Sequence, residues 1–191
     1  MKTLYLMRHG QTLFNKLEKT QGACDSPLTD AGIADAKATG QFFKEQGLYF
    51  DRYFSSTQER ASDTLELVTD QPYQRMKGIK EWDFGIFEGE SEMLLPKTYY
   101  TDGSYGDYFV EFGGESATEF QKRVIKTLKE IMSQLLDDQN TLVVCHGAVM
   151  LMFMQSLLSM EEIAKEISFH NCAVLKLTFD DDKFEFIEQV K

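Results

Sequence analysis

Two of the three histidines in this 191-residue chain lie at the ends of short apolar segments and are directly followed by glycine. His9 comes after the segment at 3–7, and His146 comes after the segment at 141–145. A neutral imidazole is a competent nucleophile toward phosphorus, and glycine lets the backbone approach an anion closely. The two His-Gly pairs therefore indicate phosphate chemistry at the ends of two predicted strands.

Two arginines could supply the positive charge that such chemistry needs. Arg8 precedes the first histidine, and Arg60 lies on the helix expected after a strand at 52–55. The planar guanidinium group can bind two oxygens of a phosphoryl group at once. Asn15 and the first amides of the helix after His146 would add neutral donors. Together these groups predict a pocket for a tetrahedral oxyanion.

The leaving alkoxide must also receive a proton, which requires a carboxylic acid near the pocket. Glu81 lies between aromatic residues, where burial would raise its pKa, and it is the preferred candidate. Asp83 and Glu88 remain alternatives. A single His-Gly pair or a single helical arginine more often has only a structural role. The prediction therefore depends on all these residues meeting at one edge of the sheet.

Apolar periodicity predicts the elements that position these residues. Strands are expected at 3–7, 52–55, 73–77 and 141–145, with a closing hairpin of strands at 174–179 and 184–190. Helices are expected at 30–46, from a Ser56 or Thr57 cap to Val68, from a Ser116–Glu119 capping box onward, and at 148–158. This alternation favours an α/β fold, a three-layer sandwich with a mostly parallel central sheet flanked by helices. Ligands of such sheets bind beyond the carboxyl ends of the strands.

Composition limits the classes of partner. The length and the 42% apolar share suit a single domain over residues 1–191. A net charge of −11 argues against nucleic acid and against an anionic membrane surface. No apolar segment approaches the length of a membrane span or of a signal peptide core. Three scattered cysteines suggest neither disulfides nor zinc, which indicates a cytoplasmic protein. The oligomeric state stays open, with a homodimer among the options.

Residues 6–15, with the sequence LMRHGQTLFN, resemble the opening motif of the histidine phosphatase superfamily, in its phosphoglycerate mutase-like branch. Further blocks follow in the order of that family. They are Gly22 to Gly32, Ser55-Ser56 with Arg60-Ala61 and Thr64, Glu81 with Gly85 and Glu88-Gly89, Gly114 to Ser116, and Val143 to Gly147. The tripeptide Arg-His-Gly alone is weak, whereas the ordered set is highly specific. The resemblance covers roughly residues 3 to 180.

The resemblance implies roles for individual residues. His9 is similar to the nucleophile that becomes phosphohistidine, and Glu81 is similar to the acid that protonates the leaving group and then activates water. The implied phosphate pocket consists of Arg8, Arg60, His146 and Asn15, with the Gly147 amide as an addition. Gln21 and Gly22 match positions near the substrate. The family uses no metal, and no cofactor is expected for a phosphatase.

The same pocket supports two reactions. A phosphatase passes the phosphoryl group to water, whereas a cofactor-dependent phosphoglycerate mutase returns it to a hydroxyl and must hold a highly anionic bisphosphate. Residues 86–115 are expected to form a lid-like insertion. Between residues 90 and 120 there is one basic residue, Lys97, against seven acidic ones, which would repel such a substrate. The sequence therefore favours a phosphatase that acts on a small phosphorylated metabolite. The alternatives are a mutase and a non-catalytic phosphate-binding module.

Overall fold

The computed structural model describes residues 1–96 and 105–191, and a six-stranded sheet forms its centre. The strands are β1 (Lys2–Arg8), β2 (Arg52–Ser56), β3 (Gln74–Met76), β4 (Asn140–Cys145), β5 (Val174–Asp180) and β6 (Lys183–Gln189). Their order across the sheet is β3-β2-β4-β1-β5-β6. β1 to β4 pair in parallel, and β5 and β6 continue the sheet as an antiparallel hairpin.

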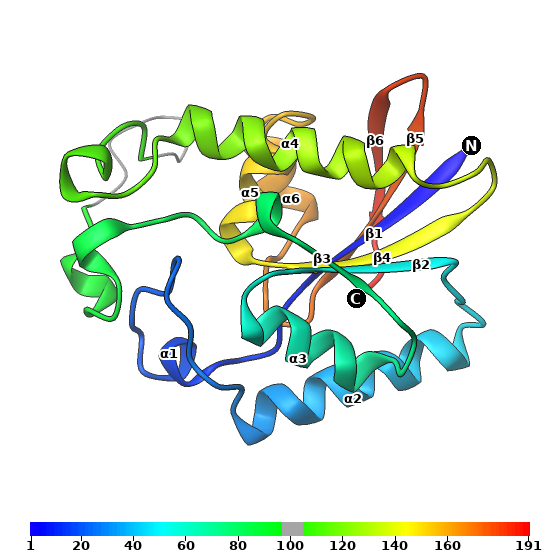
Figure 1. Cartoon of the computed structure of the whole chain (residues 1–191), viewed down its shortest axis with the longest axis horizontal. Coiled ribbons are helices and arrows are strands. Elements are labelled where there is room, and N and C mark those ends of the chain that lie inside the picture. The colour runs from blue at the N-terminus through cyan, green and yellow to red at the C-terminus, as the bar shows by residue number, and fades with distance from the viewer. Residues whose placement is uncertain (97–104) are drawn as a thin grey trace.

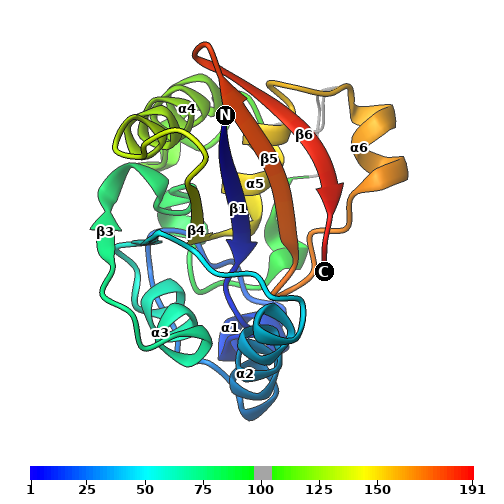
Figure 2. The ribbon, with the colours of Figure 1, turned by 90° about the vertical axis from the view of Figure 1, so that its right-hand side faces the viewer.

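Helices cover both faces of this sheet, which confirms the predicted three-layer α/β fold (Figure 1). The helices are α1 (Leu13–Lys16), α2 (Asp30–Glu45), α3 (Glu59–Val68), α4 (Ala117–Ser133), α5 (Gly147–Met154) and α6 (Met160–Glu166). In Figure 2, α2 and α3 lie on one side of the sheet, and α4, α5 and α6 lie on the other.

Alternation along the central strands creates the two cores. In β1, Leu4 and Leu6 are buried in the cluster that includes α4 and α5 residues, whereas Tyr5 and Met7 belong to the cluster on the α2 and α3 side. Successive side chains of a strand point to opposite faces, so a strand covered on both sides has to be apolar throughout. This explains why β1 and β4 read as continuous apolar runs.

Most predicted boundaries agree with the structure within one or two residues, and three helices differ, the first being the short α1, which was not predicted. The helix predicted at 148–158 ends at Met154, and a second helix, α6, begins at Met160. The α6 helix opens with a capping box in which Ser159 and Glu162 bond reciprocally. That signal was present in the sequence.

Two predicted helix caps were also wrong in detail. The N-cap of α3 is Gln58, and neither Ser56, which ends β2, nor Thr57 caps this helix. Asp25, far away in the sequence, accepts the hydrogen bond of the Glu59 amide instead. At α4 the Ser116 hydroxyl accepts from the Glu119 amide as expected, but the Glu119 carboxylate pairs with Lys122 rather than closing the box.

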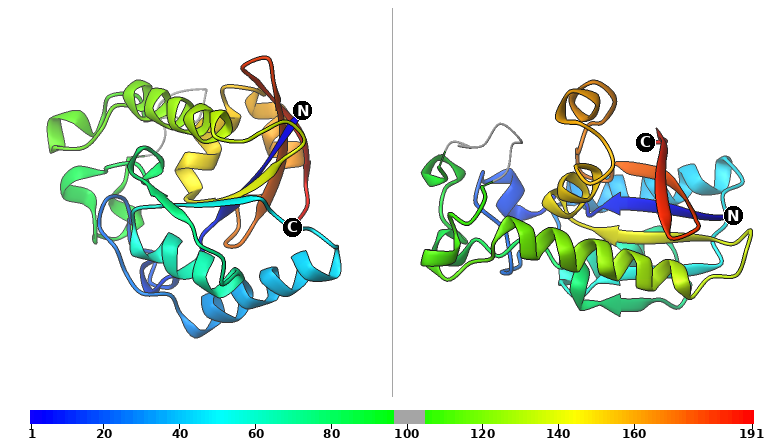
Figure 3. Two further views of the ribbon diagram at one scale, coloured as in Figure 1. Left: turned by 45° about the vertical axis from the view of Figure 1, so that its right-hand side comes forward. Right: turned by 90° about the horizontal axis from the view of Figure 1, so that it is seen from above.

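The segments that lie beyond the carboxyl ends of the parallel strands are mostly loops. The loop that contains α1 and the long connection between β3 and α4 both extend past this edge, as two views of the ribbon show (Figures 1 and 3). Backbone hydrogen bonds join these two loops over a short stretch. The Thr20 amide donates to the Glu90 carbonyl oxygen at 2.8 Å, and the Glu92 amide donates to the Glu18 carbonyl oxygen at 2.9 Å. These loops form the walls above the strand ends.

Candidate active site

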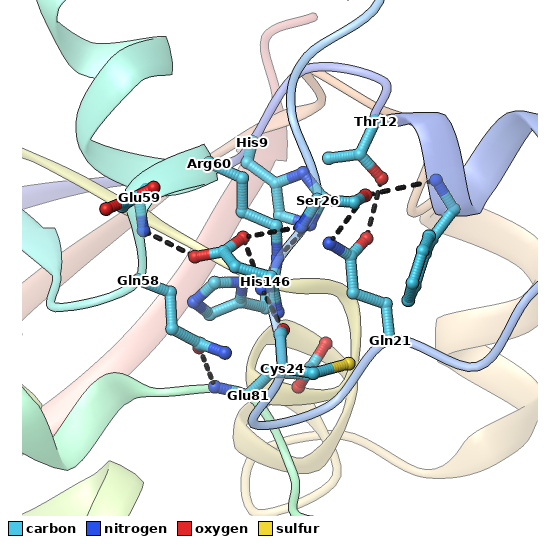
Figure 4. Close-up of polar contacts among 12 residues, drawn as sticks. His9, Thr12, Gln21, Cys24, Ser26, Gln58, Glu59, Arg60, Glu81 and His146 are labelled. Carbon is cyan, nitrogen blue, oxygen red and sulfur yellow. Dashed lines mark hydrogen bonds and ion pairs between the residues drawn. The ribbon is translucent and has the colours of Figure 1, made fainter. Parts of the chain in front are cut away.

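The predicted histidines and arginines meet at one edge of the sheet. β1 and β4 are parallel neighbours with Arg8 opposite Cys145, so His9 and His146 leave the sheet side by side. Their ring centroids are 5.2 Å apart. Arg60, in the first turn of α3, reaches the same place, and its Nε lies 3.3 Å from Nε2 of His9. Figure 4 shows these side chains clustered although they come from three separate segments.

The backbone sets the tautomer of His9. Its Nδ1 lies 2.8 Å from the carbonyl oxygen of Gly10, which can only accept, so Nδ1 carries the proton and Nε2 keeps its lone pair. The ring is 3% exposed. Burial, reinforced by the positive charges of Arg60 and Arg8, lowers the pKa of His9 well below its usual range. His9 is therefore a neutral imidazole at neutral pH, with its lone pair on Nε2.

Arg60 is fully buried and held by the loop that follows α1. Its guanidinium donates to the carbonyl oxygens of Cys24 at 2.9 Å and Gly22 at 3.0 Å, and it pairs with Asp25 at 2.9 Å. Its Nε is the group directed at His9. A charge buried this deeply needs such partners, and they fix the plane of the guanidinium beside the imidazole.

Arg8 is positioned from the opposite side. Its Nη1 donates to the Phe169 carbonyl oxygen, and its buried Nε has no hydrogen-bond partner within the described part of the chain. Gly147 borders it closely, because a Cβ at that position would lie 3.4 Å from Cζ of Arg8. A larger residue would crowd the guanidinium. The unpaired Nε is a donor for an anion in the adjacent cavity.

His146 is completely buried. Its Nε2 lies 2.7 Å from the Ser56 hydroxyl, while its Nδ1 has no partner among the residues described. Burial, followed by the charge of Arg60, lowers the pKa of His146 well below its usual range. The ring is therefore neutral, and it packs beside His9 with the two ring planes tilted by 59°.

Glu81 faces the same site from the loop after β3. Its carboxyl oxygens accept from the amides of Trp82 and Ala148, both at 3.0 Å, and the Glu81 amide donates to the Gln58 side chain at 2.7 Å. The side chain is 7% exposed. Burial raises the pKa of Glu81 despite the two amides and Arg60, which oppose the shift. A carboxyl group of this kind can hold a proton at a pH where ordinary glutamates have lost it.

The geometry distinguishes Glu81 from the two alternative acids. The Glu88 carboxylate accepts from three backbone amides, those of Ala23 and Cys24 at 2.6 Å and that of Phe84 at 3.1 Å. It clamps two loops together and lies outside the described cavity wall. Asp83 accepts from the Gly85 amide at 2.9 Å and also lies outside that wall. Glu81 alone of the three borders the cavity that contains His9.

This cavity has a volume of about 300 Å³. The described residues that line it are Arg8, His9, Asn15, Thr20, Gln21, Glu81, Phe84, Glu92, Leu95, Tyr105, Gly147, Ala148 and Leu151. It thus collects six of the nine predicted site residues. The size suits a small phosphorylated metabolite, although it is at the lower end of ligand sites.

Three predicted site residues do not contribute to the described wall. Arg60 lies at Nε2 of His9, and the His146 ring packs against the His9 ring. Gly22 lies under the loop, where its carbonyl oxygen accepts from Gln58 and Arg60. A Cβ there would lie 2.4 Å from both Glu88 and the Trp82 carbonyl oxygen. Gly22 is therefore required for close packing of the loops, and its predicted place near a substrate stays a prediction.

Asn15 and Gln21 line the cavity in different ways. The Asn15 side-chain oxygen accepts from the Thr12 amide at 3.1 Å and from Asn171 at 3.3 Å, which orients its Nδ2 as a donor. Both ends of the Gln21 amide are held within the loop, by Thr12 at 2.6 Å and Ser26 at 3.1 Å. Asn15 can therefore offer a hydrogen bond to an anion, whereas Gln21 shapes the wall.

The insertion predicted at 86–115 contributes to the wall through Glu92, Leu95 and Tyr105. Its other described aromatic residues pack on one another, with Phe109 fully buried 4.9 Å from the Tyr105 ring and 5.0 Å from that of Phe84. Lys97, the one basic residue counted between residues 90 and 120, and Asp102, one of the seven acidic residues, lie outside the described residues.

Sequence reasoning did not single out Thr20, Gln58 or Arg123. Gln58 joins the Glu81 amide to the Gly22 carbonyl oxygen. Arg123 of α4 donates to the Glu81 carbonyl oxygen at 3.0 Å and pairs with Glu115. Such partners depend on loop packing, and no local pattern marks them. Across residues 1–96 and 105–191, no three His, Cys, Asp or Glu side chains gather in a way that could hold a metal ion.

None of the helices that the structure describes combines the length and apolar character of a transmembrane segment. This agrees with the short apolar stretches of the sequence. The finding applies to the described residues of the chain.

Known proteins share both the sequence pattern and the fold. A broad-specificity phosphatase of Saccharomyces cerevisiae is 26% identical over 196 residues, which cover 96% of this chain and 82% of the yeast protein. A phosphoglycerate mutase of Bacillus anthracis superposes with a TM-score of 0.85 at 25% identity, covering 97% of this chain and 91% of that one. A phosphoserine phosphatase of Entamoeba histolytica, solved in complex with phosphoserine, gives a TM-score of 0.79 at 26% identity, with coverage of 99% and 96%.

The motifs that surround the cavity match one family profile over nearly the whole chain. The profile of the histidine phosphatase superfamily, branch 1, covers residues 4–190. Both phosphatases and phosphoglycerate mutase-like enzymes are found among the similar proteins. With its fold, its paired histidines and this profile in agreement, the chain belongs to the histidine phosphatase superfamily, branch 1, and is an enzyme of that phosphoglycerate mutase-like family.

Proposed function

We propose that the protein is a phosphomonoester hydrolase that works through a phosphohistidine on His9. The observation that carries the proposal is the combination of a neutral His9 with its lone pair on Nε2, Arg8 and the raised-pKa carboxyl of Glu81 on the walls of one cavity. A nucleophile, an anion-binding donor and a proton donor are the three groups that phosphoryl transfer to a side chain requires.

In the first step, Nε2 of His9 attacks phosphorus and the bond from phosphorus to the ester oxygen breaks. The Glu81 carboxyl gives its proton to that oxygen, so the alcohol leaves neutral. The unpaired Nε of Arg8 and Nδ2 of Asn15 hold the equatorial oxygens. Arg60 exchanges its long 3.3 Å contact with His9 for the phosphoryl group.

In the second step, the Glu81 carboxylate takes a proton from water as the oxygen attacks phosphorus. The bond from phosphorus to Nε2 then breaks and inorganic phosphate leaves. His9 returns to its neutral form, with its Nδ1 proton still held by the Gly10 carbonyl oxygen. The Gly10 carbonyl oxygen stabilises the positive charge that develops on the imidazole, because it accepts from Nδ1, while the neutral ring of His146 packs beside His9.

The phosphatase is favoured over a mutase by the charges around the cavity. Arg8 is the one arginine or lysine in the described cavity wall, where it is joined by the carboxyl groups of Glu81 and Glu92. A bisphosphate would need a second set of cations. The similar proteins include a phosphatase and a mutase, so the mutase remains the alternative that the test must address.

The test is a panel of small phosphate esters, scored for phosphate release in the presence of EDTA, with phosphoglycerate isomerisation run alongside. We expect release without added metal at a rate well above isomerisation. Isomerisation that outpaces hydrolysis would identify a mutase. Binding of phosphate analogues with no turnover and no acid-labile labelling would identify a phosphate-binding module.

The proposed roles predict a pH profile. The first step needs His9 neutral and Glu81 protonated. Since the pKa of His9 is lowered, it remains neutral well into the acid range, and since the pKa of Glu81 is raised, it remains protonated above the ordinary glutamate range. We expect kcat/KM to fall at low pH as His9 gains a proton and at high pH as Glu81 loses one, with the maximum at mildly acidic to neutral pH.

The measurement is kcat/KM for an alkyl phosphate between pH 4 and 9, corrected for ionisation of the substrate. The Glu81→Gln variant has no proton to lose at that position, so its residual activity should lack the alkaline fall. If kcat/KM of the Glu81→Gln variant still falls at alkaline pH as in the wild type, a group other than Glu81 causes that fall.

We further propose a cytoplasmic location. The three cysteines, Cys24, Cys145 and Cys172, are all free thiols in the structure. A reducing compartment keeps such thiols from forming disulfides.

A further inference from the structure

The described lining of the cavity includes polar side chains that the proposed mechanism does not use, among them those of Thr20 and Glu92. They come from the two short segments that pair beyond the strand ends, where Thr20 bonds to Glu90 and Glu92 bonds to Glu18. These backbone hydrogen bonds bring Thr20 and Glu92 into the lining of one cavity, although some seventy residues separate them in the sequence. Their joint position is therefore set by tertiary structure.

The Thr20 hydroxyl is a buried polar group that is left unpaired. The residue is 2% exposed, and its Oγ1 has no hydrogen-bond partner in the described chain. Buried hydroxyl groups are rarely left in this state, because an unmet hydrogen bond costs free energy. Since Thr20 lines the cavity, a group of the substrate is the natural partner for this oxygen.

Glu92 adds a negative charge to the same wall. The charged side chains of the described lining are Arg8, Glu81 and Glu92. Arg8 is committed to the phosphoryl group, and both oxygens of Glu81 accept backbone amides. Glu92 is an exposed residue whose side chain is only partly desolvated. That desolvation and the charge of Glu18 raise the pKa of Glu92, and the positive charge of Arg8 opposes the shift. Glu92 thus remains to interact with the body of the substrate.

A carboxylate at this position selects against negative substituents and for positive ones. A carboxylate or second phosphate on the substrate would face Glu92 without a cation to offset it, since no lysine is part of the described wall. A protonated amine would pair with the carboxylate and donate a second hydrogen bond to the Thr20 hydroxyl. Such a group would satisfy both side chains at once.

We propose that Glu92 and Thr20 form a subsite for a protonated amino group, so that the preferred substrates are phosphomonoesters of small amino alcohols. This inference rests on the proposed phosphatase function and names its substrate class. Each ester would place its phosphate at Arg8 and His9 and its ammonium at Glu92, all of which line the same cavity.

The test compares O-phosphoethanolamine with propyl phosphate, in which a methyl group of similar size replaces the ammonium. We expect wild-type kcat/KM to be at least about tenfold higher for the amine, as expected for a charge-assisted hydrogen bond. Glu92→Gln should lower kcat/KM for the amine alone, so that the kcat/KM values of the two esters differ by less than about threefold. Thr20→Val, which removes only the hydroxyl, should lower the value for the amine several-fold.

Glu90→Gln is the matched control. Glu90 is exposed, lies two residues from Glu92 and is absent from the described wall, so this variant changes the net charge equally without altering the subsite. It should keep the wild-type preference. If Glu92 only offsets Arg8, Glu92→Gln would raise kcat/KM for both esters alike, and that outcome would overturn the inference. An equal loss in Glu90→Gln would also overturn it, because the effect would then come from the overall field.

Two further measurements separate this inference from the proposed function. Hydrolysis of p-nitrophenyl phosphate without a preference between the two esters would sink the subsite and leave the phosphatase intact. If no ester is hydrolysed, calorimetric binding of both esters to the His9→Ala variant still decides the matter. Tighter binding of O-phosphoethanolamine that depends on Glu92 supports the subsite, and equal binding refutes it.

Discussion

Replacing His9 by alanine is expected to abolish phosphate release, with a fall in kcat of at least about a thousandfold. The variant keeps Arg8, Arg60 and Glu81 but has no atom that can form the bond to phosphorus. Water could in principle attack in its place, yet the site contains no group arranged to position water in the first step. The measurement is steady-state hydrolysis of p-nitrophenyl phosphate, together with trapping of acid-labile phosphate on the protein.

His170→Ala is the matched control for this prediction. His170 is exposed, and its ring contacts Ser168 rather than the cavity. The variant removes one imidazole and should retain wild-type turnover and labelling. Substantial hydrolysis by a folded His9→Ala protein, or acid-labile label that persists in it, would show that the phosphoryl group passes through a different residue or directly to water.

Replacing Glu81 by glutamine should lower kcat for an alkyl phosphate by about 10² to 10⁴-fold. The amide is close in shape but cannot give a proton to the departing oxygen. An aryl phosphate such as p-nitrophenyl phosphate needs little protonation of its leaving group, so the loss in its first step should be much smaller. The decisive quantity is the ratio of the two losses, measured in pre-steady-state bursts that isolate transfer to His9.

Asp83→Asn provides the control. Asp83 is two residues away and bonds to the Gly85 amide outside the described cavity wall, so its loss of charge should leave both substrates nearly unaffected. Because glutamine at position 81 alters the contacts with the Trp82 and Ala148 amides, thermal unfolding of each variant should be recorded as well. Equal losses for alkyl and aryl esters in a stable protein would contradict a role for Glu81 in protonating the leaving group.

Local patterns were sufficient for most of the elements. The apolar runs of β1 and β4 and the helical spacing in α2, α3 and α4 come from contacts that repeat every two or about four residues, so they are visible without a fold. Local patterns gave a wrong boundary where the end of a helix depends on contacts with residues that are distant in the sequence. The α3 helix begins at Glu59, where Asp25 from another loop accepts the first helical amide, and the sequence of residues 55–60 does not contain that information.

The amino-acid sequence by itself determined the chemistry that is present at the strand ends. It placed His9 and His146 after parallel strands, identified the order of motifs that marks the superfamily, and named Glu81 together with two other carboxylates as acids. These conclusions are available because a residue's type and its position after a strand are local properties, and because parallel strands bring their carboxyl ends to one edge.

Only the tertiary structure decided between residues of the same type. Glu81 borders the cavity, whereas the Glu88 carboxylate accepts hydrogen bonds from three backbone amides outside the cavity wall. The close packing around Gly22 likewise became visible only in the folded chain. Burial and charge neighbours also depend on the whole fold, and they set the pKa directions of His9 and Glu81. The reason is physical: desolvation and hydrogen bonding act through space, so the role of a charged residue depends on contacts with segments that are remote in the sequence.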